Sequence, residues 1–201
     1  SNDVFEEAFI FATNGTELST EWSKSVINEC NKIKRDISAQ DVNSRKDLRS
    51  LNFVTIDGSN AKDFDDAVYA EESSDGFLLY VAIADVSEYV LQDSSLDKEA
   101  LSRATSVYFE KKVIPMLPEL ISNKLCSLRP NEDKLVLTCE IYLDREGEIK
   151  SFEFFNSVIC SKNRLTYDEV EKFYQKGQTT LSSDIVSNLS TLKKIHALRR
   201  K

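Results

Sequence analysis

Histidine is almost absent from this 201-residue chain, which contains one, and its four cysteines form no C-x-x-C pair. A structural zinc site needs four closely placed His or Cys ligands, so zinc is not expected. No apolar run approaches the roughly 20 residues of a membrane-spanning helix. No basic region followed by an apolar stretch opens the chain, so neither a membrane protein nor a secretory signal is expected.

Positive charge is also scarce, since 26 Lys and Arg residues face 34 Asp and Glu residues and the net charge is −8. This sign argues against a domain that binds nucleic acid with its whole surface. A polyanionic partner would need a local basic groove, bound cations or further domains. The cysteines are expected to be reduced and buried rather than bridged, because they are widely spaced and no signal is visible, which favours a cytoplasmic protein.

The organisation along the chain predicts a leader, residues 1–50, and a main domain, residues 51–201. Residues 4–12 alternate loosely and predict an edge strand. Residues 38–49 fit either a short helix or a linker. A helix over about 20–35 is expected because four residues share a face at helical spacing: Trp22, Val26, Cys30 and Ile33.

The main domain mixes strand and helix patterns. Two prolines make residues 113–118 an extended segment rather than a helix. The expected strands are 51–56, 67–70, 77–84, 135–143 and 149–161. The expected helices are 96–107, 166–174 and 181–201. The pattern predicts an α+β fold in which helices flank a mixed, largely antiparallel sheet.

Four carboxylates fall within ten residues between two apolar strands: Asp57, Asp63, Asp65 and Asp66. Asp57 ends a strand and precedes Gly58, which permits a sharp turn. Converging carboxylates repel one another and raise one another's pKa unless a cation compensates. Mg²⁺ prefers such hard oxygen ligands and completes its shell with water or substrate phosphate. The cluster therefore indicates a candidate magnesium site.

Other interpretations of this cluster remain open on composition alone. Acidic loops are commonly just solvated, and a motif match is only a hypothesis. An EF-hand fits poorly, because the sixth position lacks glycine and the twelfth lacks glutamate. The D-x-D pattern of Asp63 and Asp65 also occurs in nucleotide-sugar sites, but it is short and weak.

Beyond the cluster, a series of ordered motifs resembles the ribonuclease II/ribonuclease R family, nearer to its ribonuclease R branch. The resemblance covers roughly residues 45–201. It rests on residues 53–58, 62–67, 81–86, 107–109, 113–119, 125–128, 159–162 and 165–167.

The resemblance implies a 3′→5′ exoribonuclease that hydrolyses single-stranded RNA with Mg²⁺ and releases 5′-monophosphates. It implies that the four aspartates are the catalytic, metal-binding set and that Tyr108 stacks on an RNA base near the 3′ end. Without the resemblance, Tyr108 is equally well a core aromatic residue. DNA and membranes are not expected as partners.

The resemblance also implies parts that this sequence does not contain. Family members have cold-shock-like domains before this region and an S1-type domain after it, and their catalytic domain continues past residue 201. The chain by itself is therefore expected to be weakly active or inactive. The alternative function is a non-catalytic RNA-binding or interaction module.

Overall fold

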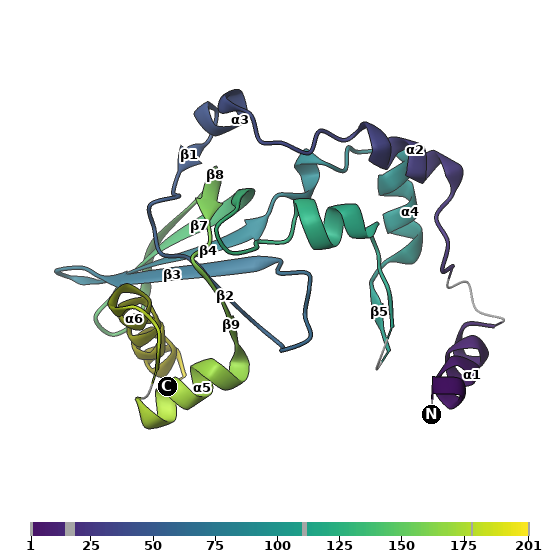
Figure 1. The fold of residues 1–201 in the computed structure, drawn as a ribbon. Coiled ribbons are helices and arrows are strands. Elements are labelled where there is room, and N and C mark those ends of the chain that lie inside the picture. The colour runs from purple at the N-terminus through teal and green to yellow at the C-terminus, as the bar shows by residue number, and fades with distance from the viewer. Residues whose placement is uncertain (1, 15–18, 110–111, 178, 201) are drawn as a thin grey trace. The chain divides into compact units, whose positions relative to one another are not determined.

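The computed structural model of the chain describes residues 2–14, 19–109, 112–177 and 179–200 (Figure 1). The chain divides into two compact units. One unit comprises residues 1–34 and 86–124, and the other comprises residues 35–85 and 125–201. Each unit is therefore made of two separate segments of the chain. The boundary expected at residue 50 stays a prediction.

The first unit is mainly helical. Its elements are α1 (Asn2–Thr13), α2 (Lys24–Lys32), η1 (Val86–Glu88), α4 (Ser95–Arg103), β5 (Val107–Tyr108), β6 (Val113–Ile114) and the π-helix η2 (Ile121–Leu125). The edge strand predicted over residues 4–12 is wrong, because α1 occupies this stretch. Its apolar residues also recur three and four apart, and its Glu and Ala residues favour helix over strand.

Helices α2 and α4 are shorter than their sequence patterns suggest. The side chain of Ser23 accepts a hydrogen bond from the N–H of Val26, so α2 begins after Ser23 rather than near residue 20. Helix α4 is capped by Ser94, but it stops before Ala104, which has a φ of 62°. A positive φ breaks the helical hydrogen-bond pattern, so residues 105–107 leave the helix.

Arg103 organises this unit and explains why Trp22 lies outside α2. The Arg103 guanidinium lies 3.7 Å from the centre of the Trp22 ring and donates hydrogen bonds to the carbonyl oxygens of Ser19 (2.9 Å) and Glu21 (2.8 Å). It also pairs with Glu99 at 2.9 Å. These carbonyl groups accept hydrogen bonds from Arg103 and not from backbone N–H groups of a helix, so Trp22 precedes α2.

The second unit is built on a seven-stranded sheet. Its elements are α3 (Ala39–Asn43), β1 (Lys46–Asp47), β2 (Val54–Asp57), β3 (Asp66–Glu72), β4 (Gly76–Ala84), β7 (Asp133–Asp144), β8 (Ile149–Cys160), β9 (Asn163–Thr166), α5 (Tyr167–Lys176) and α6 (Ser183–Arg199). The strand order is β1-β8-β7-β4-β3-β2-β9. The pairs β1/β8 and β2/β9 are parallel and the other pairs are antiparallel. The predicted α+β class with a mixed, largely antiparallel sheet is confirmed.

Strand β9 is one of the short strands that the sequence pattern missed. It has four residues, and only Leu165 among them is buried. So short a strand shows little alternation, and it forms because β2 offers a free edge: Thr55 pairs with Arg164 and Asp57 pairs with Thr166. Thr166 caps the following helix, and Thr166 and Glu169 form a reciprocal capping box.

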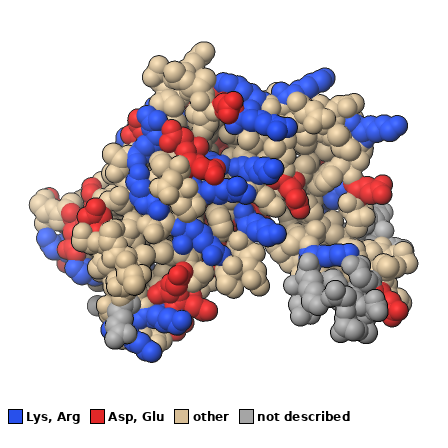
Figure 2. Space-filling model, viewed as in Figure 1, with Lys and Arg blue, Asp and Glu red and all other residues tan. Residues whose placement is uncertain are grey.

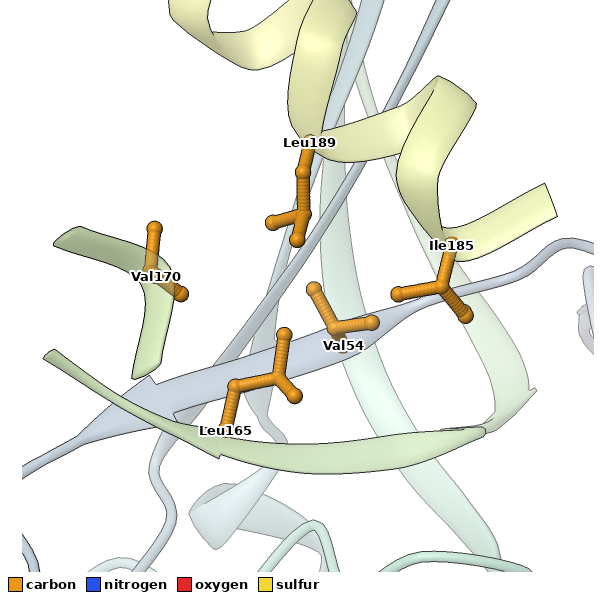
Figure 3. Close-up of a cluster of buried hydrophobic side chains, with 5 residues drawn as sticks. All are labelled: Val54, Leu165, Val170, Ile185 and Leu189. Carbon is orange, nitrogen blue, oxygen red and sulfur yellow. The ribbon is translucent and has the colours of Figure 1, made fainter. Parts of the chain in front are cut away.

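Helices α5 and α6 cover one face of the sheet (Figure 1). Val54 and Leu165, from paired strands, point toward Val170, Ile185 and Leu189 of the two helices (Figure 3). A second cluster continues along α6 and contains Ala70, Phe77, Leu143 and Ile195. Because side chains alternate along a strand, these contacts turn the neighbouring residues of β2 and β9 toward the opposite face.

All four cysteines are free, with Cys30 and Cys126 buried and Cys139 and Cys160 half-buried. Burial raises the pKa of the Cys126 thiol to about 12, with a further contribution from the charge of Asp65. In the part of the chain that the structure describes, no helix combines the length and apolar character needed to cross a membrane.

Candidate metal and RNA site

The acidic cluster occupies a loop that leaves one strand and enters the next. Asp57 is the last residue of β2, as expected, and Asp66 is the first residue of β3. Phe64 is buried, whereas its neighbour Asp63 is half-buried and its neighbour Asp65 is exposed. The two aspartates therefore share the side opposite Phe64, as alternate residues of an extended segment do.

The second half of the loop is held by residues 126–128, which lie about 65 positions later in the chain. The buried Ser127 hydroxyl accepts a hydrogen bond from the N–H of Phe64 (3.1 Å) and donates one to the carbonyl oxygen of Lys62 (2.9 Å). The N–H of Leu128 donates to the carbonyl oxygen of Phe64 (2.8 Å). These bonds bracket Asp63 and fix the path of its backbone.

The first half of the loop is held by Arg164 of β9. Its Nη2 atom donates hydrogen bonds to the carbonyl oxygens of Gly58 (2.9 Å) and Ser59 (2.7 Å). Its guanidinium carbon lies 5.5 Å from the centre of the Phe64 ring. Gly58 has no positive φ, and a Cβ atom there would meet nothing within 4 Å. The expected conformational role of Gly58 is therefore absent, and the contacts of Arg164 hold the turn instead.

The carboxylates of the loop repel one another. Loss of hydration and then the charges of Asp63, Asp66 and Asp57 raise the pKa of Asp65 to about 6, although Asp65 is an exposed residue. Burial and then the charge of Asp66 raise the pKa of Asp57, while Arg164 opposes this effect. The four side chains thus act on one another electrostatically, as close carboxylates do.

One atom of the cluster lacks the partner that burial demands. The Oδ2 atom of Asp57 is buried and has no hydrogen-bond partner among the described residues. A buried charged oxygen without a partner is costly, and a cation is the natural partner for it. The donor set of four carboxylates also matches the preference of Mg²⁺. The residues present therefore fit a bound divalent cation.

The described residues do not, however, hold a finished ligand set. Among them, no group of three or more His, Cys, Asp or Glu side chains is already arranged to hold a metal ion. The loop brings the four aspartates into one neighbourhood, and metal binding would require their oxygens to close further. The assignment of these residues as metal ligands stays a prediction.

Tyr108, the second kind of predicted site residue, lies in the helical unit on β5. Its side chain is 63% exposed, so it is not a core residue. Strand β5 pairs with β6, and Tyr108 lies opposite Val113, at the start of the proline-containing segment. An exposed ring on a paired strand suits stacking, although its contact with RNA stays a prediction.

Sequence reasoning did not single out Ser127 or Arg164. Ser127 lies inside a stretch that carries the family resemblance and Arg164 lies between two such stretches, but a lone Ser or Arg has no local pattern that marks a role. Their importance depends on contacts with a loop between 63 and 106 positions away. No signal within the sequence reveals such a contact.

Comparison with known proteins shows to which family this chain belongs. Residues 45–201 match the family model described as the RNB domain. Ribonuclease R of Acidithiobacillus ferrooxidans is 45% identical over 181 residues, which are 90% of this chain and 41% of that protein. Ribonuclease R of Mycoplasmopsis pulmonis is 47% identical over 154 residues, which are 77% of this chain and 21% of that protein.

Solved structures show the same similarity in three dimensions. Mycoplasma genitalium RNase R in complex with ribose methylated single-stranded RNA superposes with a TM-score of 0.86 at 37% identity. The match covers 91% of this chain and 29% of that chain. The chain thus spans less than half the length of the relatives described here.

Proposed function

Because this chain belongs to the RNB-domain family, of the ribonuclease II/ribonuclease R type, we propose that it carries the metal-binding part of a 3′→5′ exoribonuclease. The whole protein hydrolyses single-stranded RNA with Mg²⁺ and releases 5′-monophosphates. The observation that carries this proposal is the loop of four aspartates, in which the buried Oδ2 atom of Asp57 has no hydrogen-bond partner in the part of the chain that the structure describes.

The aspartates hold the cation, and the surrounding backbone bonds keep them in place. Asp57, Asp63, Asp65 and Asp66 are the ligands in this proposal. When bound, Mg²⁺ polarises the scissile phosphate and activates a water molecule. Ser127 and Arg164 keep the two halves of the loop in position.

RNA is held by features outside the acidic loop. Tyr108 offers an exposed ring for stacking near the 3′ end, and stacking tolerates any base. Lys and Arg side chains gather over the visible face of the sheet-containing unit, although the net charge is −8 (Figure 2). Such a local basic surface supports binding of a polyanion. RNA rather than DNA is the expected substrate.

Further parts of the whole protein complete this proposal. Cold-shock-like and S1-type domains would add contacts along the RNA, and further catalytic-domain residues would clamp the phosphate. A cytoplasmic location belongs to the proposal, and the four free cysteines support it. The alternative, a non-catalytic RNA-binding module, would not need four carboxylates that repel one another.

A labelled-RNA assay tests the proposal. The whole protein is incubated with Mg²⁺ and single-stranded RNA labelled at either end. RNA labelled at its 3′ end should release labelled mononucleotide at once, whereas RNA labelled at its 5′ end should shorten progressively to a small end product. EDTA should stop both reactions. Binding of the RNA without any cleavage in Mg²⁺ would instead support the non-catalytic module.

A further inference from the structure

Arg164 stands out in the sheet-containing unit because it joins the acidic loop to a strand that follows it by about 100 residues. The residue is half-buried and lies on β9, where it is the register partner of Thr55. Its neighbour Leu165 points into the core beneath α5 and α6 (Figure 3). Alternation along the strand therefore turns Arg164 to the opposite face, on which Thr55 and Asp57 also lie.

The hydrogen bonds of Arg164 go to the backbone and not to a carboxylate. Both go from Nη2, to the carbonyl oxygens of Gly58 and Ser59, which directly follow Asp57. The Gly58 carbonyl also accepts a hydrogen bond from the N–H of Ala61 (3.1 Å), so Arg164 holds a closed turn. The guanidinium thus sets the direction in which the chain leaves Asp57.

Three buried polar atoms near this contact make no hydrogen bond of normal geometry with a described residue: Thr55 Oγ1, Asp57 Oδ2 and Arg164 Nε. All three belong to the paired strands β2 and β9. The Thr55 side chain is nevertheless near enough to Asp57 to lower the pKa of its carboxyl group. Arg164 thus donates its hydrogen bonds to the turn, and the Asp57 Oδ2 atom stays available to bind another partner. A residue that only neutralised Asp57 would be expected to bond to its carboxylate directly.

We propose that Arg164 is a positioning residue, which fixes the Gly58–Ser59 turn and thereby holds the Asp57 carboxylate ready for a divalent cation. This inference rests on the proposed metal-dependent function. Residues that orient metal ligands typically change metal affinity about 10- to 100-fold when they are replaced. Arg164 also carries a positive charge, which by itself lowers the affinity of the site for a cation. The charge of Arg164 and its positioning of Asp57 therefore have opposite effects on this affinity.

Arg164→Lys separates these two effects, because it keeps the charge but loses the guanidinium group that lies over the Phe64 ring and whose Nη2 atom reaches both carbonyl oxygens. The matched control is Arg145→Lys, since Arg145 donates a hydrogen bond to the carbonyl oxygen of Ser74 in an exposed turn. The affinity for Mn²⁺ is measured without RNA by electron paramagnetic resonance on the whole protein. We expect the Mn²⁺ Kd to rise about tenfold in Arg164→Lys and to stay unchanged in Arg145→Lys.

A second measurement distinguishes positioning from contact with RNA. In Arg164→Lys, the Mg²⁺ concentration for half-maximal cleavage should rise, while the rate at saturating Mg²⁺ approaches that of the unaltered protein. Melting temperatures identify any loss of folding. If Arg164→Lys is unfolded, Arg164→Met is used instead. Removal of the positive charge favours Mn²⁺ binding, but loss of positioning should outweigh it, so the Mn²⁺ Kd should still rise.

The remaining outcomes count against the inference in distinct ways. An unchanged or lower Mn²⁺ Kd in the folded Arg164 variant overturns the positioning role. A loss of RNA affinity with an unchanged Mn²⁺ Kd assigns Arg164 to a phosphate contact and also overturns it. If the unaltered protein binds no Mn²⁺, the proposed metal site itself fails, and the positioning role fails with it.

Discussion

The buried hydroxyl of Ser127 accepts a hydrogen bond from the backbone N–H of Phe64 at 3.1 Å. The same hydroxyl donates to the carbonyl oxygen of Lys62, so one side chain bridges both peptide groups that flank Asp63. Segments 63 positions apart are thereby joined at the acidic loop. The loop is consequently held by distant parts of the fold as well as by its own hydrogen bond from the N–H of Ala61 to the carbonyl oxygen of Gly58.

Ser127→Ala should destabilise the chain by about 1–3 kcal/mol, because it leaves the buried N–H of Phe64 without an acceptor. Urea unfolding measures this change. The control is Ser151→Ala on an exposed stretch of β8, for which a change within about 0.5 kcal/mol is expected. Equal effects of the two substitutions would show that the Ser127 bridge adds no stability.

Asp65→Asn in the whole protein should lower the cleavage rate at least about 100-fold while RNA affinity changes little. Loss of a ligand weakens stabilisation of charge in the transition state, whereas RNA contacts are spread along the strand. Single-turnover cleavage and fluorescence anisotropy measure the two quantities. Asp75→Asn, in the exposed turn between β3 and β4, is the charge-matched control. A cleavage rate near that of the control would remove Asp65 from the metal site.

The same aspartate should make metal-free stability depend on pH. The pKa of Asp65 is about 6 in the folded chain, above its ordinary value of 3.8. The folded state therefore binds more protons than the unfolded state between these values, and stability falls as pH rises through this window. Above the pKa of about 6, the contribution of Asp65 to the free energy of unfolding is fully lost.

Melting temperatures from pH 4 to 8 in EDTA check this dependence. Asp65→Asn should melt higher than the unaltered chain at pH 7.5 and should show a smaller decrease as pH rises. The comparison with Asp75→Asn removes the general effect of lowering the net negative charge. A lower melting temperature for Asp65→Asn than for Asp75→Asn at pH 7.5 would contradict the assigned repulsion.

Tyr108→Ala should lengthen the final RNA product more than it slows cleavage of long RNA. A stacked base contributes about 1–3 kcal/mol, and a short product has few other contacts that replace it. Since Tyr108 is 63% exposed, its removal should change the melting temperature little. Tyr167→Ala, at a ring that is 62% exposed, is the matched control. An unchanged end product would argue against stacking at Tyr108.

The 201-residue chain by itself should degrade RNA very slowly or not at all. It spans 41% or less of the curated relatives described above, so many of the expected phosphate and RNA contacts are missing. Incubation with Mg²⁺ and a 3′-tailed single-stranded RNA, beside a full-length relative, measures this. Comparable turnover would show that this chain holds all the groups that catalysis needs.

Local sequence was enough to predict most elements of the sheet-containing unit. The alternating residues of β7 and β8 and the turn between them identify their hairpin, and Thr166 marks the start of α5. The four aspartates are also visible as a cluster, because they lie within ten residues. Each of these signals is local, since period, capping and spacing depend only on neighbours in the chain.

Only the tertiary structure decided how the acidic loop is held. Strand β9 has too few residues to show a period and exists because the edge of β2 is open to it. The helix α1 replaces a predicted strand because loose alternation over nine residues also fits helical spacing. Ser127 and Arg164 reach the loop through contacts that span 63 to 106 positions. Such contacts depend on how the strands are ordered, and no short stretch of sequence encodes that order.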